Sequence, residues 1–310
     1  MDAGNFDIAT LGELLIDFTD VGESGDGRKL FERNPGGAPA NVAVNASRLG
    51  ARCAFIGKVG DDVNGRFLKR VLDAEGVDSS ALFVDPTCQT TLSFVELAEN
   101  GERAFSFARR PGADMLLTAG EVGNERAQNV IQRSRILHIG SFSLTDEPAR
   151  TATFEAVAAA RKAGALISFD PNYRAKVWSS ESEATRLIRS AILKADLVKV
   201  SLEECGITTG ENDPEAAAAR LLDQGVKLGV ITLGEAGALV FCPEGTVHVA
   251  AQPVACVDAT GAGDAYWAGF LAAFLAWGKG AQDVPLRQVV MFGQAGAHQA
   301  ATCIQHRGAL

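Results

Sequence analysis

One run of the sequence has residue types and spacing suited to phosphoryl chemistry. It reads Val-Asp-Ala-Thr-Gly-Ala-Gly-Asp-Ala over 257–265 and leads into an apolar, alanine-rich segment. The small residues Gly261, Ala262 and Gly263 let successive backbone N–H groups face an anion at the start of a helix. The carboxylate of Asp264 then lies beside that anion and can take a proton from an attacking alcohol. The alternative is a plain turn in which Asp264 is only a favourable acid in the first helical turn.

Asp258 precedes this loop in the same run, and its role has two interpretations. An aspartate here can hold a cation against the loop. It can equally accept hydrogen bonds from the amides of the turn, as aspartates often do. The residues alone leave both open.

A second polar cluster is Asn-Pro-Gly-Gly-Ala-Pro-Ala-Asn over 34–41, ahead of a helix-compatible stretch. The pair Gly36 and Gly37 allows close approach of the backbone to a ligand. Asn41 can offer a donor and an acceptor to a vicinal diol. A structural turn explains the two glycines equally well.

A third cluster is Ser-Phe-Asp-Pro-Asn-Tyr-Arg over 168–174, at the end of a predicted buried strand. Open α/β sheets bind their ligands at this end of their strands. Asp170 and Asn172 are therefore candidate ligand contacts, and Arg174 can hold a phosphate with two hydrogen bonds.

The order of predicted elements indicates how these clusters are held together. Apolar strand-like runs alternate with helical patterns, which is typical of βαβ units around a mostly parallel sheet covered on both faces. The predicted strands are 6–11, 53–59, 136–140, 166–169, 197–200 and 229–233. The predicted helices include 64–74, 149–163, 183–193 and 215–223.

Two segments interrupt this alternation, at about 12–34 and 88–115. In the second, alternating apolar and polar residues flank Asn100-Gly101, which is a strong hairpin signal. No fixed-period repeat separates the chain into modules. We therefore expect a single domain over 1–310 with a small β-sheet lid built from these two insertions.

Composition narrows the classes of partner. The 310 residues include 29 basic and 38 acidic side chains, and no basic cluster suits nucleic acid. The six cysteines form no C-x-x-C pair, and the N-terminus lacks the pattern of a signal peptide. The apolar segment 265–278 is too short to span a bilayer. We expect a cytoplasmic protein with no nucleic-acid or membrane partner.

Known nucleotide fingerprints do not fit the chain. It lacks the G-x-x-x-x-G-K-[ST] motif, and its G-x-G tripeptides lack the third glycine of a dinucleotide site. Five ordered motifs instead resemble those of the PfkB (ribokinase-like) carbohydrate kinases, and within them the fructokinases most of all. They are Gly-Gly-Ala-Pro-Ala-Asn at 36–41, Phe-Ile-Gly-Lys-Val-Gly-Asp-Asp at 55–62, Ala-Asp-Met-Leu-Leu at 113–117, Asp-Pro-Asn-Tyr-Arg at 170–174 and the run at 258–264.

The resemblance implies a fold and a set of site residues. The fold is a ribokinase-like three-layer α/β/α core with a β-sheet lid. Asp264 is implied as the catalytic base, with the amides of Gly261, Ala262 and Gly263 as the anion hole. The implied sugar contacts are Asp17, Gly37 and Asn41. Further candidates for contact with the substrate are Gly36, Arg109, Asp170, Asn172 and Arg174. The implied nucleotide and Mg²⁺ contacts are Lys199, Ser201, Glu204, Thr232, Gly234 and Gly237, and the implied K⁺ ligands are Asp258 and Thr260.

Three positions depart from the pattern of the resembling family. Ser201 stands where related kinases carry the Asn of Asn-x-x-Glu, and Ala259 replaces the first Thr of the more usual Asp-Thr-Thr-Gly. The run 107–114 has Ala108 in place of an aromatic residue and gains a cation. The change in the run 107–114 leaves the identity of the sugar open, whereas Ser201 affects the expected magnesium-water contact and the effect of Ala259 should be mild.

The resemblance predicts an ATP-dependent kinase that phosphorylates a primary hydroxyl of a small keto-sugar, with D-fructose as the first candidate. The alternatives are a 2-keto-3-deoxygluconate kinase, in which Arg109 and Arg110 clamp the carboxylate of the substrate, and a sugar- or nucleotide-binding regulator without turnover. Lids in this family often pair, so we also expect a homodimer formed through the lid.

Overall fold

A computed structural model describes residues 5–97 and 103–310. Its main element is a nine-stranded sheet with the order β13-β12-β11-β10-β9-β8-β1-β4-β5. Strands β1 to β11 of this sheet run parallel, and β12 and β13 form an antiparallel edge. The strands are β1 (Phe6–Leu11), β4 (Cys53–Gly60), β5 (Asp78–Asp85), β8 (Ser134–Gly140), β9 (Leu166–Asp170), β10 (Leu197–Ser201), β11 (Leu228–Thr232), β12 (Ala238–Cys242) and β13 (Gly245–Val249).

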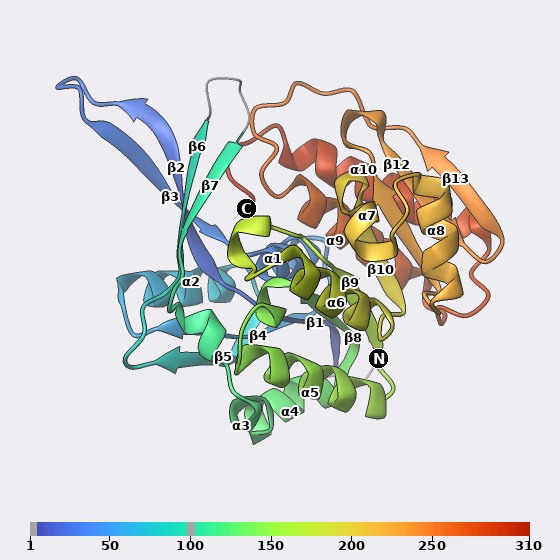
Figure 1. The fold of residues 1–310 in the computed structure, drawn as a ribbon, viewed down its shortest axis with the longest axis horizontal. Helices are drawn as coiled ribbons and strands as arrows, with labels where there is room; N and C mark the ends of the chain where they lie inside the picture. The colour runs from blue at the N-terminus through green and yellow to red at the C-terminus, as the bar shows by residue number, and fades with distance from the viewer. Residues whose placement is uncertain (1–4, 98–102) are drawn as a thin grey trace.

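Helices cover both faces of this sheet, and each layer has its own apolar core. One layer comprises α3 (Ala119–Val122), α4 (Glu125–Gln132), α5 (Ala149–Lys162), α6 (Glu181–Ile192), α7 (Cys205–Thr209) and α8 (Pro214–Asp223). The other comprises α1 (Ala38–Arg48), α2 (Val63–Ala74), α9 (Ala262–Trp277) and α10 (Leu286–Cys303). The three-layer α/β/α arrangement expected from the sequence is confirmed (Figure 1).

The predicted core strands and helices are all present with small shifts at their ends. The strands that the sequence did not reveal are β5, β12 and β13. Strand β5 exposes Val84 and begins with polar residues, so it lacks the continuous apolar run of a central strand. Strands β12 and β13 form a hairpin beyond the last parallel strand, where the βαβ alternation has ended.

The lid is a separate four-stranded sheet with the order β3-β2-β6-β7. Its strands are β2 (Leu15–Glu23), β3 (Lys29–Gly36), β6 (Leu92–Leu97) and β7 (Arg103–Ala108). They belong to the two predicted insertions, although β3 continues to Gly36, past the predicted limit. Figure 1 shows this sheet extending away from the core. The predicted Asn100-Gly101 turn lies outside the described residues.

The strand order places a switch point at β1. The chain passes from β1 to β4 and β5 on one side, and later returns to β8 and then β9 on the other side of β1. Ligands of open α/β sheets bind outside the carboxyl ends of the strands at such a point. The loops that follow β1, β9, β10 and β11 therefore meet at one edge, beneath the lid.

Helix α9 begins at this same edge and is the apolar helix expected from the sequence. Trp267 and Phe270 on it are fully buried and stack on each other, so the start of the helix is fixed firmly against the sheet. Within 5–97 and 103–310, no helix combines the length and apolar character needed to cross a membrane.

Candidate active site

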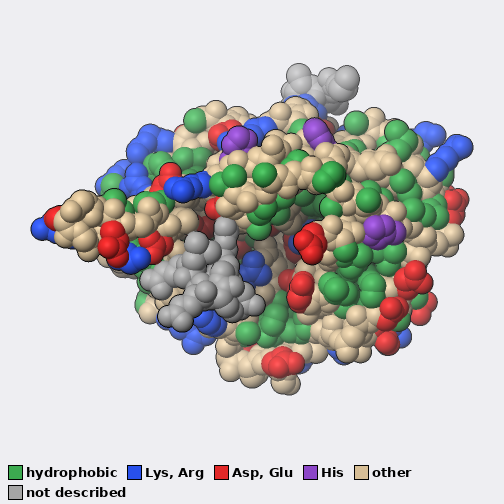
Figure 2. Space-filling model, turned by 90° about the horizontal axis from the view of Figure 1, so that it is seen from above, with side chains coloured by type: hydrophobic (Ala, Val, Ile, Leu, Met, Phe, Trp, Pro, Cys, Tyr) green, Lys and Arg blue, Asp and Glu red, His purple; other side chains and the backbone are tan. Residues whose placement is uncertain are grey.

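A cavity of about 410 Å³ lies at the carboxyl edge of the sheet, between the core and the lid. Figure 2 shows the molecule hollowed beside the lid. The predicted site residues that line the cavity are Asp17, Gly37, Asn41, Asn172, Arg174, Lys199, Ser201, Glu204, Thr232, Gly234, Thr260, Gly261, Gly263 and Asp264. Segments separated by more than two hundred residues thus line one cavity.

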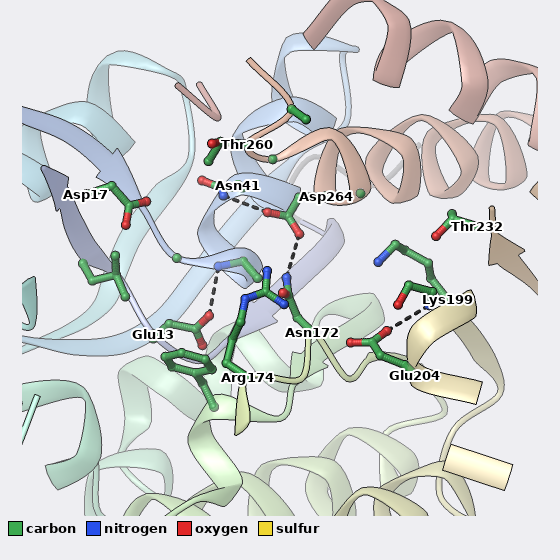
Figure 3. A pocket seen from close by; sticks show the side chains of 18 of the residues that line it. Glu13, Asp17, Asn41, Asn172, Arg174, Lys199, Glu204, Thr232, Thr260 and Asp264 are labelled. Carbon is green, nitrogen blue, oxygen red and sulfur yellow. Dashed lines mark hydrogen bonds between the residues drawn. The ribbon is translucent and has the colours of Figure 1, made fainter. Parts of the chain in front are cut away.

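Asp264 lies in the first turn of α9, and both of its carboxylate oxygens accept hydrogen bonds from amide side chains. Asn41 Nδ2 donates to Oδ2 at 2.8 Å, and Asn172 Nδ2 donates to Oδ1 at 3.1 Å (Figure 3). Asn172 has a φ of 42°, a left-handed conformation that asparagine tolerates better than most residues. Both asparagines were predicted to contact the sugar, whereas in the structure their amides orient the candidate base.

Burial changes the acidity of Asp264. Desolvation, with the charge of Asp170 added, raises the pKa of Asp264 to about 7, although the Asn41 hydrogen bond and the charges of Lys199 and Arg174 lower it. A general base works best when its pKa is close to the operating pH. The environment of Asp264 therefore suits it to accept a proton near neutral pH.

The loop before Asp264 brings backbone amides to the cavity. Gly261 precedes α9 with a φ of 76°, and a Cβ there would lie 2.4 Å from Cβ of Ala309, so only glycine fits. Gly261 and Gly263 line the cavity. The N–H of Ala262 instead donates to the carbonyl of Ala259 at 3.3 Å, and Ala262 does not line the cavity. Ala262 therefore belongs to the turn, contrary to its predicted place in the anion hole.

Lys199 supplies a cation beside this helix start. Its Nζ lies 2.7 Å from Oδ2 of Asp170, and a Cβ at Gly263 would lie 3.1 Å from the same Nζ. Burial alone would lower the pKa of Lys199, but the carboxylates of Asp170 and Glu204 raise it above its ordinary value. The positive end of α9 and the Lys199 ammonium together form a site for an anionic group.

Asp170 was predicted as a sugar contact, and the structure places it elsewhere. It is almost fully buried, binds Lys199 and accepts a hydrogen bond from the backbone N–H of Asn172. It does not line the cavity. Asp170 therefore positions Lys199 and the 170–174 loop.

The cavity continues past Lys199 to the ends of β10 and β11, where Ser201, Thr232 and Gly234 lie. The Glu204 carboxylate accepts hydrogen bonds from the backbone N–H groups of Ser201 at 2.9 Å and Tyr173 at 2.6 Å. Burial raises the pKa of Glu204, while the nearby Lys199 lowers it.

Gly237 does not reach this part of the cavity. It has a φ of 98° in the turn before β12, and a Cβ there would lie 2.2 Å from the carbonyl of Val249. Its predicted nucleotide contact is thus replaced by a role in the turn, because no other residue fits that backbone position.

At the lid end of the cavity, Asp17 is the predicted sugar ligand. Burial raises the pKa of Asp17 to about 6, and the charge of Arg174 lowers it. Gly36 does not line the cavity. It packs against Asp17, and a Cβ at Gly36 would come 2.1 Å from Asp17 Oδ2. Gly36 therefore makes room for Asp17, and Gly37 forms the cavity wall.

Arg109 is the clearest correction among the predicted sugar contacts. Its guanidinium binds Asp114 through Nε at 2.8 Å and reaches the Thr145 hydroxyl at 2.9 Å and the Phe142 carbonyl at 3.0 Å. It is 5% exposed and does not line the cavity. Arg110, the other cation of this run, is exposed and donates to the carbonyl of Val177. Arg109 therefore stabilises the base of the lid.

The predicted K⁺ ligands adjoin the anion-hole loop. Asp258 is buried, and its carboxylate accepts hydrogen bonds from the backbone N–H groups of Thr260 at 2.6 Å and Gly308 at 3.1 Å. Thr260 lines the cavity, and its carbonyl accepts a weak hydrogen bond from Cys303 Sγ at 3.5 Å. A carboxylate and a carbonyl are the oxygen ligands that hard cations prefer, so these residues fit a cation. The two amide contacts also fit the alternative role of Asp258 in the turn.

Several lining residues were not predicted. They are Glu13, Leu15, Ala38, Phe107, Phe142, Glu203 and Ala259. Glu13 offered a usable signal, because it comes two residues after the end of a predicted buried strand, where α/β ligands bind. Phe107 and Phe142 offered none, because isolated phenylalanines are usually core residues.

Comparison with known proteins agrees with this geometry. The model of the pfkB family carbohydrate kinases matches residues 5–309. Fructokinase-1 of Zea mays is 44% identical over 269 residues, covering 86% of this chain and 82% of its own. Probable fructokinase-7 of Arabidopsis thaliana is 42% identical over 269 residues, covering 85% and 77%.

Solved structures show the same fold. A double mutant of the fructokinase from Vibrio cholerae O395, in a form that binds fructose, ADP and a potassium ion, superposes with a TM-score of 0.86 at 33% identity, covering 99% of this chain and 95% of its own. Aminoimidazole riboside kinase from Salmonella enterica superposes with a TM-score of 0.82 at 30% identity, covering 98% and 95%. The expected ribokinase-like fold is thus confirmed, and the chain belongs to the pfkB family of carbohydrate kinases.

Proposed function

We propose that the protein transfers the γ-phosphoryl group of ATP to a primary hydroxyl of D-fructose. The observation that carries this proposal is the position of Asp264, which two asparagine amides hold at the start of α9 beside the Lys199 ammonium. The relatives named fructokinase and the Vibrio cholerae structure with fructose and ADP support the choice of sugar.

The residues of the cavity suggest how the transfer proceeds. Asp264 takes the proton of the attacking hydroxyl as the new O–P bond forms and the bond from the γ-phosphorus to the bridging oxygen of ADP breaks. The amides of Gly261 and Gly263 and the ammonium of Lys199 stabilise the charge on the phosphoryl oxygens. The lid covers the sugar and excludes water, which would otherwise accept the phosphoryl group.

We further propose that ATP binds with Mg²⁺ on the Ser201 side of the cavity. Mg²⁺ usually keeps several waters and binds through substrate phosphates with one or two carboxylates. Glu203 and Glu204 line this side and fit that pattern through water. The bound ion would neutralise phosphate charge.

K⁺ is proposed at Asp258 and the Thr260 carbonyl, where it would order the loop that carries Gly261 and Gly263. The test is activity in potassium, sodium and tetramethylammonium salts at one ionic strength. We expect the highest rate in potassium. Equal rates in all three salts would mean that Asp258 binds no cation and only accepts hydrogen bonds from the turn.

The charges of the cavity favour a neutral sugar over 2-keto-3-deoxygluconate. Glu13 and Asp17 line the end near the lid, and neither Arg109 nor Arg110 lines the cavity. An acidic substrate would bring its carboxylate near that of Asp17 without the expected arginine clamp. Among the described residues, Arg174 is the arginine that lines the cavity.

A coupled assay of ADP release tests the function directly. The panel contains fructose, 2-keto-3-deoxygluconate, ribose and aminoimidazole riboside, with ATP and Mg²⁺ present, and Asp264→Asn serves as the inactive control. We expect the highest kcat/KM with fructose. A higher kcat/KM with another member would reassign the substrate, and binding without ADP release from any member would favour a regulator.

We also propose that two lids pair to form a homodimer in the cytoplasm. Leu30 and Phe31 on β3 are exposed, and Phe31 packs edge-on against Phe94 of β6. Exposed apolar groups on a small sheet are suited to contact with another protein. Phe31→Asp should give a monomer by analytical ultracentrifugation, whereas a wild-type monomer would contradict the pairing.

A further inference from the structure

Glu13 is a buried acid whose hydrogen bonds the fold only half completes. It lies after β1, is 4% exposed and lines the cavity. Its Oε1 accepts a hydrogen bond from the backbone N–H of Ala38 at 2.9 Å, whereas its Oε2 is buried and has no hydrogen-bond partner within 5–97 and 103–310. Buried polar atoms normally have partners, because leaving one unpaired costs free energy. The unpaired Oε2 therefore points to a partner that the described part of the chain does not provide.

The position of Glu13 shows which substrate it would meet. Figure 3 shows Glu13 and Asp17 on one side of Asp264, with Lys199 and Thr232 on the other. Lys199 and Thr232 belong to the side proposed for ATP. Glu13 therefore faces the part of the cavity that the sugar would occupy.

We propose that Glu13 is a specificity-determining residue, whose Oε2 forms a hydrogen bond with a sugar hydroxyl other than the one that is phosphorylated. The hydroxyl that is phosphorylated must lie at Asp264, so Glu13 contacts a different hydroxyl of the sugar. This inference rests on the proposed sugar kinase activity and adds one recognition contact to it.

The surroundings of Glu13 indicate how it makes this contact. Burial raises the pKa of Glu13 to about 8, while the backbone amides of Glu13 itself and of Ala38 and the charge of Arg109 lower it, and the charge of Asp114 raises it. Glu13 thus carries a proton at neutral pH, with Oε1 accepting from Ala38 and Oε2 donating into the cavity. The oxygen of a sugar hydroxyl can accept a hydrogen bond from this protonated carboxyl group, so no buried charge is required.

If Glu13 only stabilised the fold, its Oε1 alone would be needed and its Oε2 would have no role. The bond from Ala38 to Oε1 ties the start of α1 to the end of β1, and Gly37 packs against the backbone at Glu13. That role predicts the same effect on every substrate when Glu13 is changed. A contact through Oε2 predicts an effect only on sugars that carry the partner hydroxyl.

The test is a double-mutant-type cycle, in which variants of Glu13 are compared on sugars that each lack one hydroxyl. The wild type, Glu13→Ala and Glu13→Gln are assayed for kcat/KM with fructose and with fructoses that each lack one hydroxyl. A lost hydrogen bond in a dry pocket changes kcat/KM by roughly tenfold or more. We expect Glu13→Ala to lose at least that factor with fructose and less than about threefold with one deoxyfructose, while the KM for ATP stays the same. Glu13→Gln should retain most activity, because its amide can accept from Ala38 and donate to the hydroxyl.

The outcomes separate this inference from the proposed function. If the wild type phosphorylates none of the fructoses, the sugar assignment fails whatever Glu13 does. If the wild type is active and Glu13→Ala loses the same factor with every sugar, or nothing with any, the Glu13 contact is overturned. Should Glu13→Ala not fold, the cycle is repeated with Glu13→Asp, whose carboxyl group is one methylene shorter and cannot span both contacts.

Discussion

Asn41 and Asp264 are joined by a hydrogen bond of 2.8 Å across 223 positions of the chain. Asn41 lies in the first turn of α1 and Asp264 in the first turn of α9, so the two helix starts meet at the switch point of the sheet. The bond fixes the carboxylate of the candidate base against the cavity. Asn172 completes the arrangement from the end of β9.

Replacing the candidate base should remove catalysis with little effect on binding. We expect Asp264→Asn to lower kcat by a factor of ~10² to 10⁴, the usual effect of losing a positioned general base. The KM values for sugar and ATP should change little, because the side chain keeps its shape. Steady-state kinetics check this, and a kcat close to that of the wild type would exclude Asp264 from the proton transfer.

The raised pKa of Asp264 predicts how activity and stability depend on pH. Only the ionised form accepts a proton, so kcat should fall as the pH drops below about 7. Between its unfolded pKa of 3.8 and about 7, the folded protein binds more protons at Asp264 than the unfolded chain does. This group therefore adds stability at acid pH that is lost as the pH rises through about 7. Asp264→Asn should weaken that part of the pH dependence in urea unfolding, and an unchanged dependence would contradict the raised pKa.

Asn41 should lower the pKa of Asp264 without taking part in the proton transfer. Its hydrogen bond lowers the pKa of Asp264, so Asn41→Ala should raise that pKa and move the acid limb of the kcat profile to higher pH. Asn45→Ala is the matched control, because Asn45 lies one turn later in α1 and bonds the backbone of Asn41. A profile that shifts equally in both variants would point to a general disturbance of the helix.

Asp17 should determine sugar affinity. A carboxylate that accepts sugar hydroxyls makes charge-assisted bonds, so Asp17→Ala should raise the sugar KM by about 10- to 100-fold and leave the ATP KM nearly unchanged. Asp20→Ala provides the control, because Asp20 lies on the same strand but pairs with Lys29 at the surface. An unchanged sugar KM in Asp17→Ala would mean that the sugar lies at another edge of the sheet.

Arg109 should contribute to stability and not to sugar binding. Arg109→Ala leaves Asp114 buried without its partner, which typically costs about 3 to 5 kcal/mol. We expect a lower free energy of unfolding by denaturant, with the sugar KM of the folded variant within about twofold of the wild type. Arg110→Ala, at the exposed neighbour, should change neither quantity. A large rise in sugar KM without loss of stability would restore Arg109 as a substrate contact.

The class of fold can be predicted from the sequence alone, and so can the candidate anion site in one loop. Buried strands such as β9 and β11 are short, mostly apolar runs between helical patterns, so their strand character can be recognised locally. The loop before Asp264 can also be recognised locally. Small residues directly before an apolar helix predict an anion site wherever the helix lies in the fold. The five ordered motifs then identified the family.

The tertiary structure decided which side chains face the cavity. Asp170 and Arg109 stand in motifs beside true lining residues, yet each turns to a buried partner of opposite charge, because an unpaired charge in the core is costly. Glu13 reaches the cavity because the end of β1 meets the start of α1, a contact between distant segments. Spacing along the chain cannot show such pairings, since they depend on how strands and helices from different parts of the sequence pack together.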